Sequence, residues 1–228
     1  MTKQQVAELA SYIEIGKMGM PIGKQDQYAS AFGGLNKITF TSEGVTVEQV
    51  RIDPEVRKTL ERRLMLFFTG SSRESTSILK HQRKSTQDRD ESVLKALHNI
   101  KQVAIDVQSC LERGDLDEFA RLLDYSWQEK RRLAPGLSTG FIDELYTLAL
   151  EKGAAAGKIT GAGGGGFMML YCREEAQDAV TVALEERGLK RMNFHFDQQG
   201  ATVVLNVANF NNLWVAPYAE PEAQFQTQ

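Results

Sequence analysis

The sequence predicts an α+β fold, an antiparallel sheet packed against helices, and two observations carry that prediction. Short apolar runs that end in glycine or in polar turns predict buried strands, and longer segments with apolar residues three or four apart predict helices. From residue 63 onward these elements follow in the order strand, helices, strand, helix, strand, strand, with helices expected on one face of the sheet. The chain has 228 residues, of which 42% are hydrophobic, so it can bury a substantial core.

The first 62 residues predict a smaller unit of two helices and a hairpin. Residues 2–16 carry apolar side chains at helical spacing, and Thr2 is a suitable N-cap. A second helix is predicted over residues 24–32, where Gly33 and Gly34 end it. The segments NKITFT and VTVEQVRI, separated by Ser-Glu-Gly, predict a β-hairpin.

Three helices are predicted in the middle of the chain. Residues 90–113 carry a long apolar stripe on one helical face. The second helix begins after Asp115 as its cap and ends at Pro135-Gly136, and the third is capped by Ser138. Their length and number predict that helices make up much of the larger unit.

Four apolar segments predict the strands of the larger unit: RRLMLFFTG, FMMLYC, MNFHFD and ATVVLNV. A helix over residues 174–187 separates the second strand from the third, and a polar turn joins the last two. The polar, proline-containing end of the chain is expected to fray.

Charge and composition exclude several classes of function. The net charge of −3 offers no electrostatic footprint for nucleic acid or for an anionic membrane. Cys110 and Cys172 lie far apart without histidine at ligand spacing, which argues against a zinc site and favours a reducing compartment. No window approaches 18 apolar residues and the N-terminus has no apolar signal core, so a cytoplasmic location is expected.

A run of glycines, GAGGGG at residues 161–166, stands between a predicted helix and a buried strand. Glycine costs about 0.5–1 kcal/mol relative to alanine at each ordered position, so a compensating role is expected. The usual role is a close approach of backbone N–H groups to an anion such as phosphate. The alternative is a flexible connection. The run matches neither the P-loop pattern nor a GxGxxG after a strand.

The longer segment KITGAGGGGFMML resembles the third motif of the GHMP kinases, the superfamily of galactokinase, homoserine kinase, mevalonate kinase and phosphomevalonate kinase. In that family the glycine loop packs beside the nucleotide phosphates and the phosphoryl acceptor. The resemblance implies that the following residues bind the phosphates of ATP: Gly161, Ala162, Gly163, Gly164, Gly165 and Gly166.

A second segment, Gly-Lys-Gln-Asp-Gln at residues 23–27, resembles the part of the sugar kinases in this family that supplies the catalytic aspartate, here Asp26. The longer strings PIGKQDQYASAFGGLN and LMLFFTGSSRESTSIL resemble most closely the bacterial D-glycero-D-manno-heptose 7-phosphate kinases and the kinase part of L-fucose kinases. The resemblance covers about residues 2–207 and implies the two-domain GHMP kinase architecture with a ferredoxin-like C-terminal α+β sandwich.

The chemistry of Asp26 agrees with this role. A carboxylate in the first turn of a helix is favoured in its ionised form by the helix dipole. Phosphoryl transfer passes through a loose transition state, so orienting the hydroxyl and accepting its proton late suffices. The alternative is that Asp26 only caps its helix. Five further residues are expected to contact the substrate: Gln25, Gln27, Tyr28, Thr69 and Arg73. Arg73 would do so through the planar fork of its guanidinium.

Two family motifs have no counterpart here, the N-terminal strand and the Gly-Leu-Gly-Ser-Ser-like loop that wraps the ATP phosphates. ATP and Mg²⁺ are the expected cofactors, but no metal ligand is assigned, because the family's ligands would precede this sequence. The expected domains are a partial GHMP kinase N-terminal domain at 1–62, a C-terminal domain at 63–216 and a flexible tail at 217–228.

The expected parent activity is an ATP-dependent sugar kinase whose acceptor is D-glycero-D-manno-heptose 7-phosphate. A fucose- or galactose-type kinase and a non-catalytic module that binds sugar or nucleotide are alternatives. The chain itself can be a truncated kinase, a decayed fragment or a shortened binding protein, and little activity is expected of it alone. Partners are expected to be the small-molecule sugar phosphate and ATP, without nucleic acid or membrane, and the oligomeric state stays open.

Overall fold

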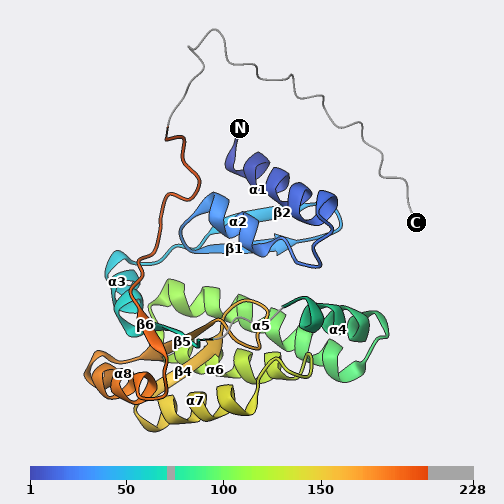
Figure 1. Cartoon of the computed structure of the whole chain (residues 1–228). Helices are drawn as coiled ribbons and strands as arrows, with labels where there is room; N and C mark the ends of the chain where they lie inside the picture. Colours follow the sequence, from blue (N-terminus) through green and yellow to red (C-terminus); the bar gives the residue numbers. More distant parts are fainter. Residues whose placement is uncertain (71–74, 205–228) are drawn as a thin grey trace.

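The computed structural model describes residues 1–70 and 75–204, apart from the side chains of 75–77. Figure 1 shows a small N-terminal unit above a larger body, with the chain passing between them twice, through α3 and again near β6. No helix in these described ranges is long and apolar enough to cross a membrane.

The N-terminal unit begins with α1 (Lys3–Ser11), whose first turn is closed by a capping box between Thr2 and Gln5, as predicted. The helix continues into a π-helical turn, Tyr12–Lys17, which the apolar pattern did not predict. Helix α2 (Gln25–Phe32) follows and ends at Gly33, as expected.

The predicted hairpin is confirmed as β1 (Asn36–Phe40) and β2 (Val45–Gln49), paired antiparallel. A small core joins it to the two helices: buried Ala7, Tyr28 and Ala31 pack with partly buried residues of the strands. Because a two-stranded hairpin is marginal by itself, this packing against α1 and α2 is what stabilises it.

The larger body contains a four-stranded antiparallel sheet in the order β4-β5-β3-β6, which confirms the predicted sheet type. Its strands are β4 (Ala154–Ile159), β5 (Phe167–Cys172), β3 (Leu64–Phe68) and β6 (Lys190–Met192). The small residues of β4 hid this strand from the pattern analysis.

The strand predicted at MNFHFD is wrong, because β6 ends at Met192. The backbone N–H of Phe196 donates to the Glu61 carboxylate at 2.8 Å instead of joining a ladder. Residues 201–204 form no strand either, and the rest of the predicted strand ATVVLNV lies outside the described residues.

Helices surround the sheet. Their bounds are α3 (Pro54–Arg63), α4 (Ser75–Gln87), α5 (Glu91–Arg113), α6 (Leu116–Arg131), α7 (Gly140–Glu151) and α8 (Gln177–Glu185), the last preceded by a 3₁₀ turn at Glu174–Ala176. The pattern analysis assigned neither α3 nor α4.

Helix ends agree with the predictions only in part: α8, predicted over residues 174–187, begins at Gln177 and ends at Glu185. Asp115 caps α6 as expected, by accepting from the Glu118 amide. Helix α6 ends at Arg131, before the predicted proline. Thr139, not Ser138, caps α7 by accepting from the Ile142 amide, because the Ser138 hydroxyl bonds to the Asp143 carboxylate instead.

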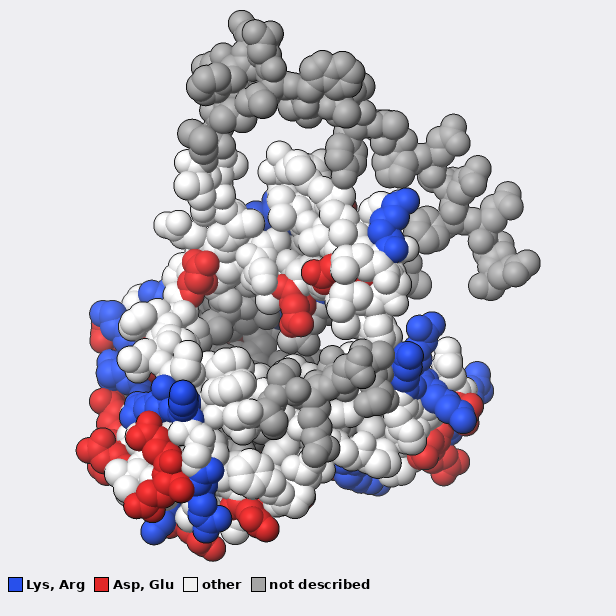
Figure 2. All heavy atoms as spheres, in the orientation of Figure 1, with Lys and Arg blue, Asp and Glu red and all other residues white. Residues whose placement is uncertain are grey.

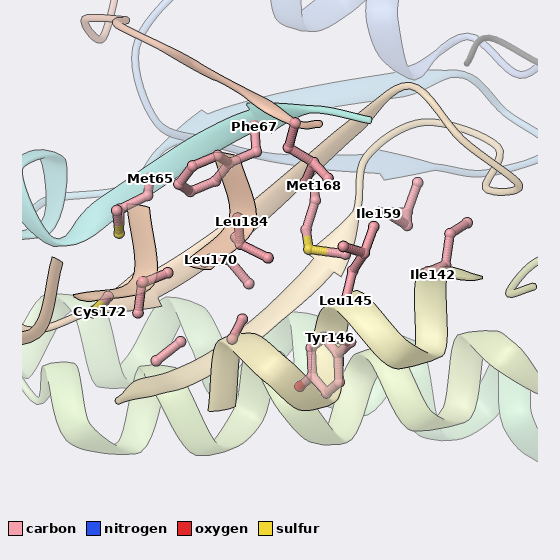
Figure 3. Close-up of a cluster of buried hydrophobic side chains, with 14 of the residues drawn as sticks. Met65, Phe67, Ile142, Leu145, Tyr146, Ile159, Met168, Leu170, Cys172 and Leu184 are labelled. Carbon is pink, nitrogen blue, oxygen red and sulfur yellow. The ribbon is translucent and has the colours of Figure 1, made fainter. Parts of the chain in front are cut away.

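Both faces of the sheet are covered, which corrects the expectation of helices on one face. Met65, Phe67, Met168 and Leu170 point to one side, toward the residues of α7 and α8 seen in Figure 3. Alternate residues of the same strands, such as Leu64 and Tyr171, pack with α5 and α6 on the other side. The strands are apolar at successive positions, so each face needs its own cover.

Replacing Leu170 by alanine tests this core. The side chain is fully buried between β5 and the helices, so the change should lower the free energy of unfolding by about 2–5 kcal/mol in urea denaturation. The exposed Val182 of α8 provides the control: Val182→Ala should change it by less than about 0.5 kcal/mol. Equal effects of the two changes would contradict the assigned core.

Candidate functional site

Asp26 is the second residue of α2 and its carboxylate is exposed. The residue that precedes the helix is Lys24, without a side-chain cap, and Asp26 accepts no hydrogen bond within the described residues. The alternative that Asp26 is only a helix cap therefore has no hydrogen bond to support it. Asp26 instead lines an open cavity of about 390 Å³ on the N-terminal unit.

Three further polar side chains, Glu14, Gln27 and Ser30, line the Asp26 cavity. Gln27 is only 8% exposed, and its amide nitrogen donates to the Glu14 carboxylate. Its amide oxygen is buried and has no partner among the described residues. A buried amide oxygen without a donor is costly, so a ligand hydroxyl or a water would stabilise it.

Glu14 is a candidate that the sequence analysis missed. It lies in the π-helical turn that follows α1, and single π-turns are frequent at functional sites. The sequence gives one usable sign, a carboxylate within an otherwise apolar helical stretch, but the position of that carboxylate depends on the extra residue per turn. Only the structure brings Glu14 to the Asp26 cavity.

Tyr28 and Gln25 lie differently from Asp26. The Tyr28 ring is buried, stacks on Phe32 and meets Phe40 edge to face, and its hydroxyl accepts a hydrogen bond from Gln4. These contacts give Tyr28 a packing role in the N-terminal unit. Gln25 is exposed in the first turn of α2 and makes no side-chain hydrogen bond in the described part of the chain.

The glycine loop joins β4 to β5, so it is the turn of a β-hairpin, and the expected helix-to-strand connection is wrong. Two of its glycines are required by packing. A Cβ at Gly163 would lie 2.3 Å from a methyl carbon of Leu137, and one at Gly164 would lie 2.9 Å from Ile78. At Gly161 and Gly166 a Cβ would meet nothing, although φ is positive at both.

Hydrogen bonds hold the loop at its centre and at its end. The Gly164 amide donates to the Leu137 carbonyl at 2.9 Å. The amide and hydroxyl of the buried Thr69 both donate to the Gly166 carbonyl, at 2.9 and 3.0 Å. The amides of Gly165 and Gly166 donate to no acceptor in the described ranges, so they are available to water or to an anion. Thr69 thus positions the loop; Arg73 lies outside the described residues.

Two lysines flank this loop. Lys130, near the end of α6, donates to the Gly161 carbonyl at 2.5 Å, and Lys158 belongs to β4. Burial, together with the nearby Lys158 charge, lowers the pKa of Lys130 to about 8. Burial also lowers the pKa of Lys158. The glycine loop is therefore accompanied by two partly desolvated positive charges.

The cavity that Asp26 lines contains no residue of the glycine loop among its described walls. The Asp26 cavity is formed by the N-terminal unit and Ala201, without a residue of the loop. Figure 1 places α2 in the upper unit and the β4–β5 hairpin in the larger body, and Figure 2 shows a hollow between those parts. Their union in one cleft stays a prediction.

A larger cavity, of about 530 Å³, lies where the hairpin β1–β2 faces α5, α6 and the sheet. Its walls are mostly apolar, but Ser126 and Lys158 add polar groups on the side of the larger body. The two-part architecture therefore leaves an open space next to β4, the strand that leads into the glycine loop.

The fold and the glycine loop together define the class of protein. Residues 107–190 match the family described as GHMP kinases C terminal, so this part of the chain is a GHMP kinase C-terminal domain. That family relationship confirms the resemblance recognised in the glycine motif.

Three relatives are similar over most of this chain. The D-glycero-alpha-D-manno-heptose 7-phosphate kinase of Campylobacter jejuni is 36% identical over 197 residues, 86% of this chain and 58% of the relative. A crystal structure of a D-glycero-D-manno-heptose 1-phosphate kinase from Bacteroides thetaiotaomicron superposes with a TM-score of 0.66 at 30% identity, covering 88% of this chain and 54% of that one. A putative sugar kinase from C. jejuni superposes with a TM-score of 0.67 at 33% identity, covering 88% and 56%.

The chain thus spans little more than half the length of each relative. These relatives are kinases of sugars or sugar phosphates by name, which supports a kinase-type protein. Activity and substrate belong to the proposals below.

Alanine substitutions in the glycine loop separate packing from backbone strain. Gly161→Ala should cost about 1–2 kcal/mol, the penalty of a left-handed residue in open space. Gly163→Ala carries the same kind of penalty and also a clash with Leu137, so its effect in urea denaturation should be larger. Equal losses would show that Leu137 does not restrain the loop.

The pKa of Lys130 predicts a pH dependence. The pKa falls from 10.5 in the unfolded chain to about 8 in the folded protein, so the unfolded state binds more protons between these values. The free energy of unfolding should therefore rise with pH across this window, relative to that of Lys130→Met. Urea denaturation of both proteins from about pH 7 to about pH 10 measures the difference. A difference that is constant with pH would contradict the lowered pKa.

Proposed function

We propose that this chain carries the acceptor side of an ATP-dependent kinase that phosphorylates a hydroxyl of a sugar phosphate. One observation supports this most directly. Asp26 presents an exposed carboxylate, free of hydrogen bonds within the described residues, beside the buried and unpartnered amide oxygen of Gln27. A binding module has no need of a positioned carboxylate, whereas phosphoryl transfer to an alcohol does.

In the proposed reaction Asp26 orients the acceptor hydroxyl and receives its proton late. The hydroxyl oxygen forms a bond to the γ-phosphorus of ATP as the bond to the ADP oxygen breaks. Because that transition state is loose, an ionised aspartate is basic enough to take the proton. Asp26 lies in the first turn of α2, where a negative charge interacts favourably with the helix dipole.

The neighbours of Asp26 suit a polyhydroxylated ligand. The Gln27 amide oxygen can accept from one hydroxyl, and Ser30, which also lines the cavity, can donate or accept. Glu14 holds the Gln27 amide group in place. These side chains therefore position the sugar, while Asp26 alone is assigned the proton.

The cofactors of the proposed reaction are ATP and Mg²⁺. Magnesium commonly binds one or two carboxylates together with phosphate oxygens and water, and Glu14 and Asp26 offer two carboxylates on one cavity. These two carboxylates can supply part of the coordination of Mg²⁺. The described residues contain no group of three or more acidic, histidine or cysteine side chains that would complete it. A bound Mg²⁺ would neutralise phosphate charge, and the amides of Gly165 and Gly166 are the proposed contacts of the phosphates.

We propose D-glycero-D-manno-heptose 7-phosphate as the acceptor, following the name of the Campylobacter relative. The name of the Bacteroides structure also specifies a phosphorylated heptose. A fucose- or galactose-type acceptor and a non-catalytic binding role are the alternatives. We place the protein in the cytoplasm, where ATP is available and where buried free cysteines such as Cys110 and Cys172 stay reduced.

Asp26→Asn tests the assigned role. In the complete enzyme it should lower the rate of phosphoryl transfer from radiolabelled ATP to the heptose 7-phosphate at least about a hundredfold, because the amide cannot accept the proton. Asp178→Asn is a matched control: Asp178 is also exposed, also second in its helix, and belongs to α8. That control should change the rate by less than about twofold.

The outcomes separate the alternatives. A loss of less than about threefold in Asp26→Asn would exclude Asp26 as the base. A complete wild-type protein that binds the sugar phosphate without labelling it would support the non-catalytic role instead. Labelling of fucose or galactose in preference to the heptose phosphate would reassign the acceptor.

A further inference from the structure

Lys130 and Lys158 are unusual among the basic residues around the glycine loop. The neighbours of Lys130 on α6 are matched with carboxylates: Arg132 pairs with Glu129 at 2.8 Å, and Arg131 pairs with Asp143 at 2.8 Å. Lys130 has no carboxylate partner in the described part of the chain and bonds only to the Gly161 carbonyl.

Lys158 is unpaired as well. Two lysines line the larger cavity, and Lys37 is paired with Glu48 at 3.1 Å, whereas Lys158 makes no ion pair with any described residue. The register of β4 places Lys158 opposite Met169, on the face of the sheet that borders this cavity. Its ammonium group therefore reaches the open space beside the glycine loop.

The remaining geometry supplies neutral donors at the same place. Ser126 precedes Lys130 by one helical turn on α6 and lines the cavity with Lys158. The amides of Gly165 and Gly166, which have no acceptor among the described residues, belong to the glycine loop. Lys130 donates to the carbonyl of Gly161, the first residue of the same loop. Donors from a helix, a strand and a loop thus belong to adjoining segments, and no ion pair with a described acidic side chain neutralises Lys130 or Lys158.

This arrangement is unfavourable unless an anion is bound. Two ammonium groups close together and partly removed from water repel each other, and burial penalises both charges. Such a pair is expected to be retained where a bound anion offsets its cost, since one anion can pair with both lysines. The lowered pKa of Lys130 agrees with an unsatisfied charge at this position.

We propose that Lys130 and Lys158 form a binding site for a phosphate group of a substrate, beside the glycine loop. The ligand is a phosphate dianion, carried either by the nucleotide or by the sugar acceptor. The source of the phosphate rests on the proposed function; the anion site itself does not. Charge-assisted hydrogen bonds from the two ammonium groups hold it, and the loop amides complete the contacts.

The first test is binding of inorganic pyrophosphate, measured by titration calorimetry on this chain. Lys130→Met and Lys158→Met should each weaken binding at least about tenfold, since each removes a charge-assisted hydrogen bond. Lys101→Met is the control, because Lys101 is an exposed helical lysine of α5 that pairs with no described carboxylate, and its replacement removes the same charge. Its effect should stay within about twofold.

A second readout distinguishes binding from a structural role. Without an anion, both methionine variants should be at least as stable as the wild type, because an unpaired buried charge is removed. At about pH 8.5, pyrophosphate binding should take up a proton in the wild type and not in Lys130→Met, since the anion raises the pKa of Lys130. Calorimetry in buffers of different ionisation enthalpy measures that uptake.

Further titrations identify the source of the phosphate. If the variants weaken ATP and spare the heptose 7-phosphate, the site holds a nucleotide phosphate; the reverse result assigns it to the acceptor. Undiminished pyrophosphate binding in both variants, or destabilised variants that bind normally, would overturn the proposal. Pyrophosphate binding needs no turnover, so its loss would leave the kinase proposal standing, and absent phosphoryl transfer would leave the anion site standing.

Discussion

The pairing of β3 with β5 is the constraint on which the candidate phosphate site depends. Their antiparallel register sets Phe68 opposite Phe167, so the next residue, Thr69, reaches the end of the glycine loop and bonds the Gly166 carbonyl twice. Pairing of β4 with β5 holds the other end, where the Thr160 amide donates to the Phe167 carbonyl at 2.9 Å. A polyglycine turn would otherwise sample many conformations, and these ladders restrict it.

Polar groups without a protein partner occur where a ligand is proposed, and two more, Arg63 Nε and Trp127 Nε1, lie buried in the scaffold. The amide oxygen of Gln27, two loop amides and the ammonium group of Lys158 lack protein partners among the described residues. Elsewhere on α6, cations and carboxylates are matched, as at Arg132 and Glu129. Natural proteins tolerate such local costs mainly at functional sites, where a ligand supplies the missing partner.

Several elements were predictable because their signals are local. Helix α5 carries its own apolar stripe and its own cap at Asp90, and the hairpin β1–β2 shows alternation and a turn. Strand β4 was not predictable from composition, because Ala154–Ile159 is strand only through its pairing with β5. Phe194 and Phe196 have strand-like alternation, but the Phe196 amide donates to the Glu61 carboxylate and no ladder forms there. Non-local pairing overrides propensity in both places.

The sequence by itself indicated the family through its motifs, and it singled out Asp26 and the glycine loop as candidate site residues. It could do so because the charge of an aspartate and the conformational freedom of a glycine are properties of single residues. Only the tertiary structure decided that Glu14 shares a cavity with Asp26, and that Lys130 of α6 donates a hydrogen bond to the glycine loop. Only it revealed which loop glycines are required by packing, Gly163 and Gly164, through contacts with Leu137 and Ile78. These facts depend on segments distant in the chain, whose approach is set by the packing of the whole domain.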